Sequence, residues 1–110
     1  MEQTTTEEKS KDRSGWNTVY IGRQKPVMNY VLATLTCLNN SPNVILKARG
    51  AAISLAVDVA QITMHRFVQG VKVSNVKIDT EQMQSEEGGT RNVSTIEIEL
   101  TTAGEPEAQA

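Results

Sequence analysis

Histidine, cysteine and aromatic residues are scarce in this sequence, and their scarcity limits its possible chemistry. His65 is the only histidine and Cys37 the only cysteine. Zinc sites use three or four Cys, His or carboxylate ligands at short spacing, and no such cluster occurs. The turn "GRQKP" at residues 22–26 has one glycine and lacks the Gly-Lys-Ser/Thr sequence of a phosphate-binding loop. We therefore expect no enzyme, metal, cofactor or small-molecule substrate.

Long apolar runs and cysteine pairs are also missing. No stretch reaches the roughly 20 apolar residues that span a bilayer, and the first residues lack the apolar core of a secretion signal. A single cysteine cannot form an internal disulfide, which fits a reducing cytosol. Cys37 lies in an apolar helical pattern, as expected of a small buried hydrophobic residue. We expect a soluble cytoplasmic protein without a membrane partner.

The two ends of the chain differ in composition from its middle. Residues 1–15 contain no aliphatic residue after Met1, and residues 103–110 read "AGEPEAQA". Such segments cannot bury enough apolar surface to offset the entropy lost on ordering them. We predict disordered tails at 1–15 and 103–110 around one folded domain at 16–102.

Charge of one sign is not in excess either. The formal net charge is -2, and residues 16–102 carry seven acidic and eight basic residues. A nearly neutral domain has no general field that attracts polyanions. Any anion binding must therefore come from local placement of cations.

The middle of the chain alternates between strand and helix patterns. Val27, Val31, Leu35 and Leu38 fall on one helical stripe after Pro26, whose fixed φ suits a first helical turn. The expected elements, in order, are a strand at 17–22, a helix at 26–40, a strand at 43–49, a helix from 51 to about 68, a strand from 71 with a bulge near 74–75, and a strand at 92–100 after a Gly88-Gly89 turn. This β-α-β-α-β-β order predicts an α/β (α+β) sandwich with a mixed four-stranded sheet. The last two strands form an extended hairpin arm, because their apolar alternation stops well before the turn.

The second helix carries more apolar surface than a small sheet can cover. Its predicted core stripe consists of Ile53, Ala56, Val57, Ala60, Met64 and Phe67. A second apolar line, Leu55, Val59 and Ile62, indicates a contact with another subunit. The alternative is that this line is simply more core.

Four cations lie where the first two strands end. Arg23 and Lys25 follow the first strand, and Lys47 and Arg49 end the second. Parallel strands joined by a crossover helix end at the same edge of a sheet. The N-terminal ends of both helices lie at that edge, and their free N–H groups favour anions. The pattern predicts an edge that grips phosphates, although solvated strand ends would explain the same spacing.

Three strings, "VYIGRQKPVMNYVLATLTCLNN", "VILKARGAAISLAVDVAQI" and "RNVSTIEIEL", resemble the Alba family of small archaeal chromatin proteins. The resemblance covers nearly all of residues 19–100. It implies a βαβαββ fold, a homodimer that can form higher assemblies on DNA, and binding of double-stranded DNA and RNA. The nucleic-acid-binding positions that it implies are Arg23, Gln24, Lys25, Asn29, Lys47, Arg49 and, in the arm, Arg91. Phe67 matches an aromatic residue that the family uses between dimers.

Departures from the family pattern change the expected affinity. The usual Gly-Lys-Lys-Pro turn is Gly-Arg-Gln-Lys-Pro here, so Arg23 or Gln24 replaces a lysine that the family regulates by acetylation. A second arginine after "KARG" is Ala51, and a lysine one turn later is Leu55. The arm carries Glu81, Glu86 and Glu87. Each lost phosphate contact lowers the salt slope by about 0.9 and weakens binding at physiological salt, so we predict a binder of weakened, salt-sensitive affinity.

Two other functions fit the sequence. One is an RNA-binding subunit of an RNA-processing complex, because related domains serve there. The other is a protein-interaction scaffold that has lost most nucleic-acid affinity, which the acidic arm and tails favour. Four scattered aromatic residues offer no platform for single strands. We therefore expect duplex DNA as the main ligand and a chromosome-associated location.

Overall fold

The computed structural model describes residues 17–102, and it has the predicted order of elements. Trp16 and the two predicted tails lie outside the described residues. The elements are β1 (Thr18–Tyr20), α2 (Val27–Asn40), β2 (Asn43–Arg49), a 3-10 turn η1 (Gly50–Ala52), α3 (Ile53–Ile62), a π-helical turn η2 (Thr63–Phe67), β3 (Val71–Gln84) and β4 (Thr90–Thr102). No described helix is long and apolar enough to cross a membrane.

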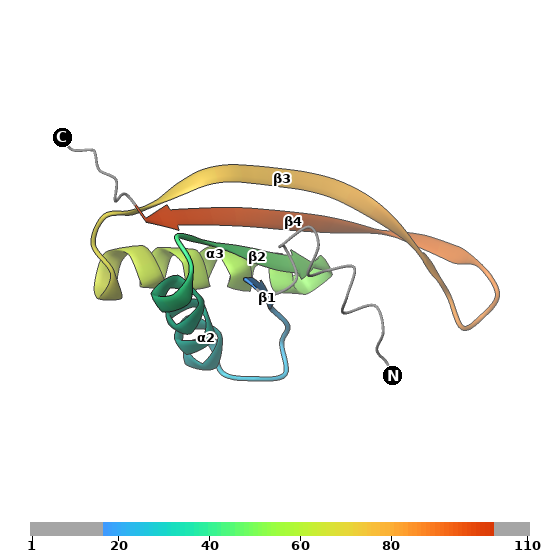
Figure 1. Cartoon of the computed structure of the whole chain (residues 1–110). Coiled ribbons are helices and arrows are strands. Elements are labelled where there is room, and N and C mark those ends of the chain that lie inside the picture. Colours follow the sequence, from blue (N-terminus) through green and yellow to red (C-terminus); the bar gives the residue numbers. More distant parts are fainter. Residues whose placement is uncertain (1–16, 103–110) are drawn as a thin grey trace.

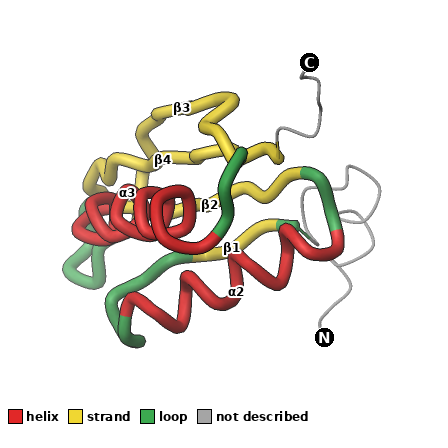
Figure 2. The backbone as a smooth tube through the Cα atoms, turned by 90° about the vertical axis from the view of Figure 1, so that its left-hand side faces the viewer, coloured by secondary structure: helices red, strands yellow, loops and turns green. Residues whose placement is uncertain are grey.

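The four strands form one mixed sheet in the order β1-β2-β4-β3. β1 pairs with β2 in parallel, and the other two pairings are antiparallel. Both helices lie on one face of this sheet, α2 against β1 and β2 and α3 against β2 and β4 (Figures 1 and 2). The predicted α+β fold with a mixed four-stranded sheet is therefore confirmed, and its second face is open.

The core lies between the sheet and the helices. Val44, Leu46 and Ala48 are buried, as the alternation of β2 predicts. Their cross-strand partners on β4 are Leu100, Ile98 and Ile96, respectively. Because paired residues share a face of a sheet, these side chains form one apolar layer, and Leu46 and Leu100 are completely buried.

Helix α2 covers β1 and β2 with a narrow stripe. Val31 and Thr34 are fully buried, and the Thr34 hydroxyl donates to the Tyr30 carbonyl oxygen over 2.8 Å. This bond satisfies the only polar atom that the Thr34 side chain brings into the core. Cys37 is half-buried, and burial raises the pKa of its thiol. The thiolate is therefore disfavoured at neutral pH, as expected of a packing residue.

Helix α3 differs from the prediction in its ends and in its buried face. It begins after a 3-10 turn, and its last turn is π-helical, with the Val68 N–H donating to the Thr63 carbonyl oxygen over 3.0 Å. Its core face is centred on Ala52, Ala56 and Ala60. These small residues lie one helical turn apart and let the helix approach the sheet closely.

This rotation of the α3 core face corrects two predictions. Val57 and Phe67, expected in the core, are exposed. Val59, expected at a contact with another subunit, is completely buried within the chain and cannot make that contact. Leu55 and Ile62 are partly buried against the core. The cause is that the alanines, not the larger side chains, set the line of closest approach to the sheet.

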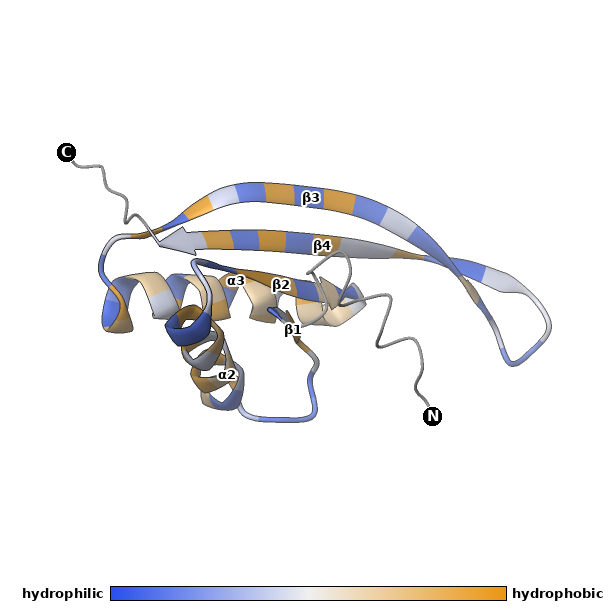
Figure 3. Cartoon of the chain, viewed as in Figure 1, coloured by the Kyte–Doolittle hydropathy of each residue, from blue (hydrophilic) through white to orange (hydrophobic). Residues whose placement is uncertain are grey.

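The last two strands extend beyond the body as an arm, residues 80–94 (Figure 1). Arg49, the last residue of β2, pairs with Thr95, so β4 has no β2 partner before that residue. The predicted bulge is confirmed, since the register of β3 shifts between Val73 and Asn75. Apolar and polar residues alternate along both strands near the body, and the arm itself is mainly polar (Figure 3).

Candidate nucleic-acid interface

The site is an open hollow at the edge of the sheet where β1 and β2 end. Three segments line it: the turn after β1, the end of β2 with the 3-10 turn, and the base of the arm. Because β1 and β2 are parallel, their C-terminal ends meet at this edge. Of the seven predicted binding residues, the hollow brings together Arg23, Gln24, Lys25, Lys47, Arg49 and Arg91. Asn29 is exposed on the first turn of α2 and does not line it.

The first turn presents its cations freely. Arg23, Gln24 and Lys25 are exposed in a bend between Gly22 and Pro26. Within residues 17–102, neither Arg23 nor Lys25 makes an ion pair. Pro26 is followed by the helix, and its carbonyl oxygen accepts from the Asn29 N–H over 3.0 Å, so the bend is anchored to α2. These two cations are available to an incoming phosphate.

Arg49 is engaged by the arm. Its Nη1 donates to Glu81 Oε1 over 3.0 Å and lies 3.6 Å from Met83 Sδ. The Arg49 and Glu81 side chains are 58% and 53% exposed, so this ion pair is worth only about 0.2–1 kcal/mol. A phosphate that binds Arg49 must replace Glu81. The sequence does not reveal this pairing, because it depends on how the arm twists across the end of β2.

Lys47 is engaged by its own sheet. Its Nζ lies 3.6 Å from Glu97 Oε2 and 5.9 Å from the centroid of the Tyr20 ring. Tyr20, Lys47 and Glu97 are successive cross-strand partners on the open face. The two cations of "KAR" are therefore both held by carboxylates in the free protein, unlike those of the first turn.

Gly50 connects the cationic end of β2 to the 3-10 turn. Its φ of +58° is a left-handed conformation that residues with a Cβ rarely adopt. A Cβ built there would lie 3.6 Å from Val93 Cγ1 in the arm, which is ordinary contact. The need for glycine thus arises from the backbone and not from lack of space.

A further set of exposed apolar residues lies on α3 with its last turn and on the edge strand β3. Val73, Val76 and Ile78 pair with Leu100, Ile98 and Ile96, so they lie on the helix side of the sheet. No helix covers β3, and Ile78 is 75% exposed. Val57 and Phe67 add exposed apolar side chains on α3. We call these five residues the β3–α3 apolar face. Sequence reasoning found an apolar excess on the helix but missed the contribution of the edge strand.

Side chains that could bind a metal ion do not gather in the described part of the chain. Residues 17–102 contain no cluster of three or more His, Cys, Asp and Glu side chains that could hold a metal ion. The exposed His65 ring lies 2.8 Å from Gln61 Oε1, within its own helical turn. What the hollow offers chemically is a set of guanidinium, ammonium and amide groups suited to phosphate oxygens.

Comparison with known proteins agrees with these observations. The Alba family model matches residues 17–80. The "DNA/RNA-binding protein Alba" of Picrophilus torridus is 52% identical over 87 residues, which cover 77% of this chain and 94% of the relative. The "DNA/RNA-binding protein Alba 1" of Archaeoglobus fulgidus is 58% identical over 85 residues, covering 76% and 93%, respectively.

Two solved structures are similar as well. Alba from Thermoplasma volcanium is 50% identical, has a TM-score of 0.72, and is matched over 77% of this chain and 99% of its own. ALBA1 from Trypanosoma brucei is 27% identical, has a TM-score of 0.64, and is matched over 79% and 69%, respectively. By sequence and by fold, the chain belongs to the Alba family.

Proposed function

We propose that this protein is a homodimeric, largely sequence-independent binder of double-stranded DNA that also binds RNA, and that it associates with the chromosome. The observation that carries the proposal is the convergence of Arg23, Lys25, Lys47, Arg49 and Arg91 on one hollow. The relatives are named as DNA/RNA-binding proteins, not as enzymes. We propose the same of this chain.

The contacts we propose go mainly to the phosphate backbone. Arg23 and Lys25 make no ion pair with residues 17–102, while Lys47 and Arg49 can exchange their carboxylate partners for phosphates. Both helices pack on one face of the sheet (Figure 2), and the hollow is lined mainly by a turn, strand ends and the base of the arm rather than by a recognition helix. Backbone contacts fix the position of a protein on a duplex but carry no direct sequence information. Binding should therefore be similar for unrelated sequences.

Dimerisation is supported by the β3–α3 apolar face. An uncovered edge strand with a row of apolar residues is a liability in a monomer. A second copy related by a two-fold axis would cover the same residues on both chains. Such a dimer would also place two hollows and two arms on one assembly. We assign the contact to this face rather than to the line of Leu55, Val59 and Ile62.

We further propose that the affinity is weak and salt-sensitive. Ala51 and Leu55 stand where the family usually has cations, and carboxylates already hold Lys47 and Arg49. Each phosphate contact contributes about 0.9 to the slope of log affinity against log salt. With roughly three contacts fewer per subunit, binding falls by on the order of a thousandfold or more, relative to a fully basic relative, at moderate salt.

One observation favours a second function, the protein-interaction scaffold. Among the described residues, the two ion pairs of the hollow engage Lys47 and Arg49, which would otherwise be available to bind nucleic acid. A scaffold that has lost its ligand would tolerate such pairs. An RNA-processing subunit is the remaining alternative within nucleic-acid binding.

The test is a salt titration of binding with the purified full-length chain. One duplex DNA and one matched duplex RNA are each titrated from about 20 to 300 mM salt, where counterion release dominates. A linear fall of log affinity with log salt, equal for unrelated sequences, supports backbone binding. A clear preference for RNA moves the function towards RNA processing. No binding at the lowest salt rejects the proposal in favour of the scaffold.

A further inference from the structure

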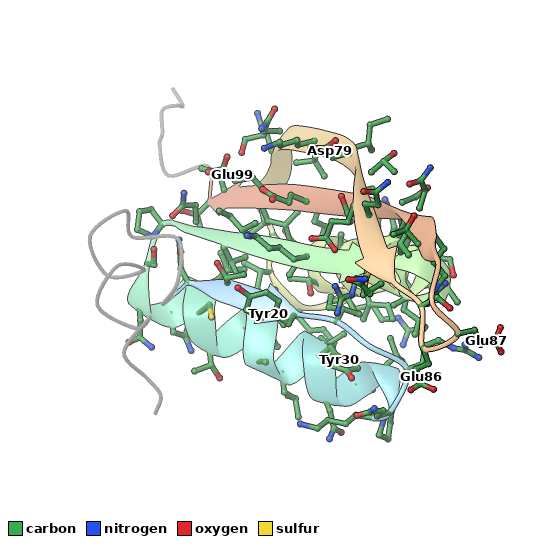
Figure 4. The ribbon with its side chains drawn as sticks, turned by 90° about the vertical axis from the view of Figure 1, so that its right-hand side faces the viewer. Tyr20, Tyr30, Asp79, Glu86, Glu87 and Glu99 are labelled. Carbon is green, nitrogen blue, oxygen red and sulfur yellow. The ribbon has the colours of Figure 1, made fainter. Side chains whose placement is uncertain are left out.

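Tyr20 occupies an unusual position for an aromatic residue of a small sheet. Its neighbours Val19 and Ile21 are buried against the helices, so Tyr20 points to the opposite, open face. The side chain is 60% exposed although it lies within a strand. In Figure 4 it lies on β1, between α2 and β2. A tyrosine ring of this kind buries little of its own surface, so core packing does not explain it.

Cations surround Tyr20, and one carboxylate lies with them, since Glu97 Oε2 is 3.6 Å from Lys47 Nζ. Lys47, its cross-strand partner, holds its ammonium 5.9 Å from the ring centroid. The ring also lines the hollow that contains Arg23 and Lys25. The ammonium lies over the ring, so a base that stacks on that face takes its place. Because a planar base and its phosphate are separated by a single ribose, the displaced ammonium stays within reach of the phosphate of the same nucleotide. Base–aromatic stacking beside a positively charged groove is the way in which single strands are bound.

We propose that Tyr20 is a stacking platform for one unpaired nucleobase of single-stranded RNA, with Lys47 holding the phosphate of the same nucleotide. This inference rests on the proposed function and deepens it. A base inside a duplex already has neighbours on both faces and cannot stack on Tyr20 unless it leaves the helix. The pair therefore adds a preference for unpaired nucleotides to a surface that otherwise grips backbone. Scattered aromatic residues in the sequence argued against this mode, but one ring suffices when the fold places a cation beside it.

A competing explanation is that Tyr20 serves the strand alone. Tyrosine favours strands, and the ring could simply pack on the Lys47 side chain. The two explanations differ in what they require of the ligand. A platform needs a base opposite the ring, whereas a strand-stabilising residue is indifferent to whether the ligand has bases.

The experiment measures binding of the full-length protein to a short single-stranded oligouridylate and to the same oligonucleotide with abasic sites. Tyr20→Val removes the ring and keeps a strand-favouring side chain, and Tyr20→Phe keeps the ring. The wild type should prefer the intact oligonucleotide by about five- to tenfold, the lower end of the range for one stacked base. Tyr20→Val should abolish this preference, and Tyr20→Phe should retain it. A duplex RNA, whose bases are already stacked, should lose less affinity for Tyr20→Val than the single strand does.

Three results would overturn the inference. Equal binding of intact and abasic strands by the wild type would show that no base is stacked, and salt-dependent duplex binding would then leave the proposed function standing. An equal loss on single-stranded and duplex RNA in Tyr20→Val would assign the residue to the strand. No binding of any nucleic acid by the wild type would reject the proposed function, and this inference with it. Circular dichroism of the variants verifies that the sheet is intact.

Discussion

The basic edge of the body and the hairpin arm carry opposite charge, although both line one hollow. The edge, which we define as Arg23, Lys25, Lys47 and Arg49, contains four cations within two short segments. The arm contains Glu81, Glu86 and Glu87 with Arg91 as its single base. Glu81 reaches back to Arg49 over 3.0 Å. The edge thus gathers the cations that we propose for phosphate binding, while the arm places a carboxylate against one of them.

Net charge alone does not reveal the local cluster of cations in this chain. Residues 16–102 are almost neutral because the arm and the open sheet face cancel the edge. A neutral total can therefore contain a local anion site, provided that the cations are gathered by the fold and the acids lie on another element. How much the acids matter depends on their distance from the cations, and this can be tested.

The largest effect is expected from a substitution that disrupts the proposed dimer, which would bring two edges and two arms together. Val76→Glu places a carboxylate in the centre of the β3–α3 apolar face, twice per dimer because the contact is isologous. An unpaired buried charge costs about 3–5 kcal/mol, so the dissociation constant of the dimer should rise at least a hundredfold. Sedimentation equilibrium measures it.

The matched control for this change lies on the other face of the same strand. Asn75→Glu adds the same charge on the open face, where Asn75 pairs with Glu99. It should leave the dimer intact. A Val76→Glu protein that dimerises like the wild type would rule out this face as the contact.

The next effect removes cations from the edge itself. Lys25→Ala and Arg49→Ala should each weaken duplex binding on the order of ten- to a hundredfold at low salt, as expected of a charge-assisted contact. Each should also lower the salt slope by about one, equally for unrelated sequences. Fluorescence anisotropy at several salt concentrations measures both quantities. Lys72→Ala removes the same charge from an exposed β3 position outside the hollow, and an equal loss there would contradict a localised edge.

A smaller effect is expected at Gly50, which follows the basic edge and lies next to Val93 of the arm. Gly50→Ala forces a residue with a Cβ into φ +58°, which should lower the free energy of unfolding by about 1–2 kcal/mol. Gly89→Ala, in the turn of the arm, has no positive φ and open space around the new Cβ. It should be neutral or slightly stabilising. Urea denaturation of both variants compares them, and equal stability would mean that the backbone at residue 50 relaxes.

The smallest effect is expected from removing the arm carboxylate that holds Arg49. Glu81→Gln frees Arg49 and should raise duplex affinity about two- to fivefold, the value of an exposed ion pair. Glu86→Gln removes the same charge from the arm, but Glu86 makes no ion pair among the described residues. It should therefore change affinity less.

A double-mutant cycle separates direct competition from general repulsion. In an Arg49→Ala background, Glu81→Gln should do no more than Glu86→Gln, because the partner that Glu81 holds is gone. If Glu81→Gln weakened binding in the wild-type background, the carboxylate would be positioning Arg49 for phosphate rather than competing with it.

The order of elements, the core-facing side of β2 and β4, and the bulge near residue 74 could all be predicted from the sequence. These features follow from periodicity and turn residues, which act over a few positions. The sequence also placed the first-turn and β2 cations at one edge, because parallel strands joined by a crossover helix leave no other arrangement.

Three features could not be predicted from the sequence and depend on tertiary packing: the buried face of α3, the acids that hold the cations, and the position of the exposed Tyr20 ring. The alanines of α3 set its rotation through the depth at which it packs on the sheet, and helical spacing alone is compatible with neighbouring rotations. Glu81 meets Arg49, 32 positions earlier in the sequence, because the arm twists back across the end of β2. Tyr20 lies beside Lys47 because two strands align in register. All three features depend on contacts between segments that are distant in sequence. The energy of each contact is small, so neither segment shows a sequence pattern from which the contact could be predicted.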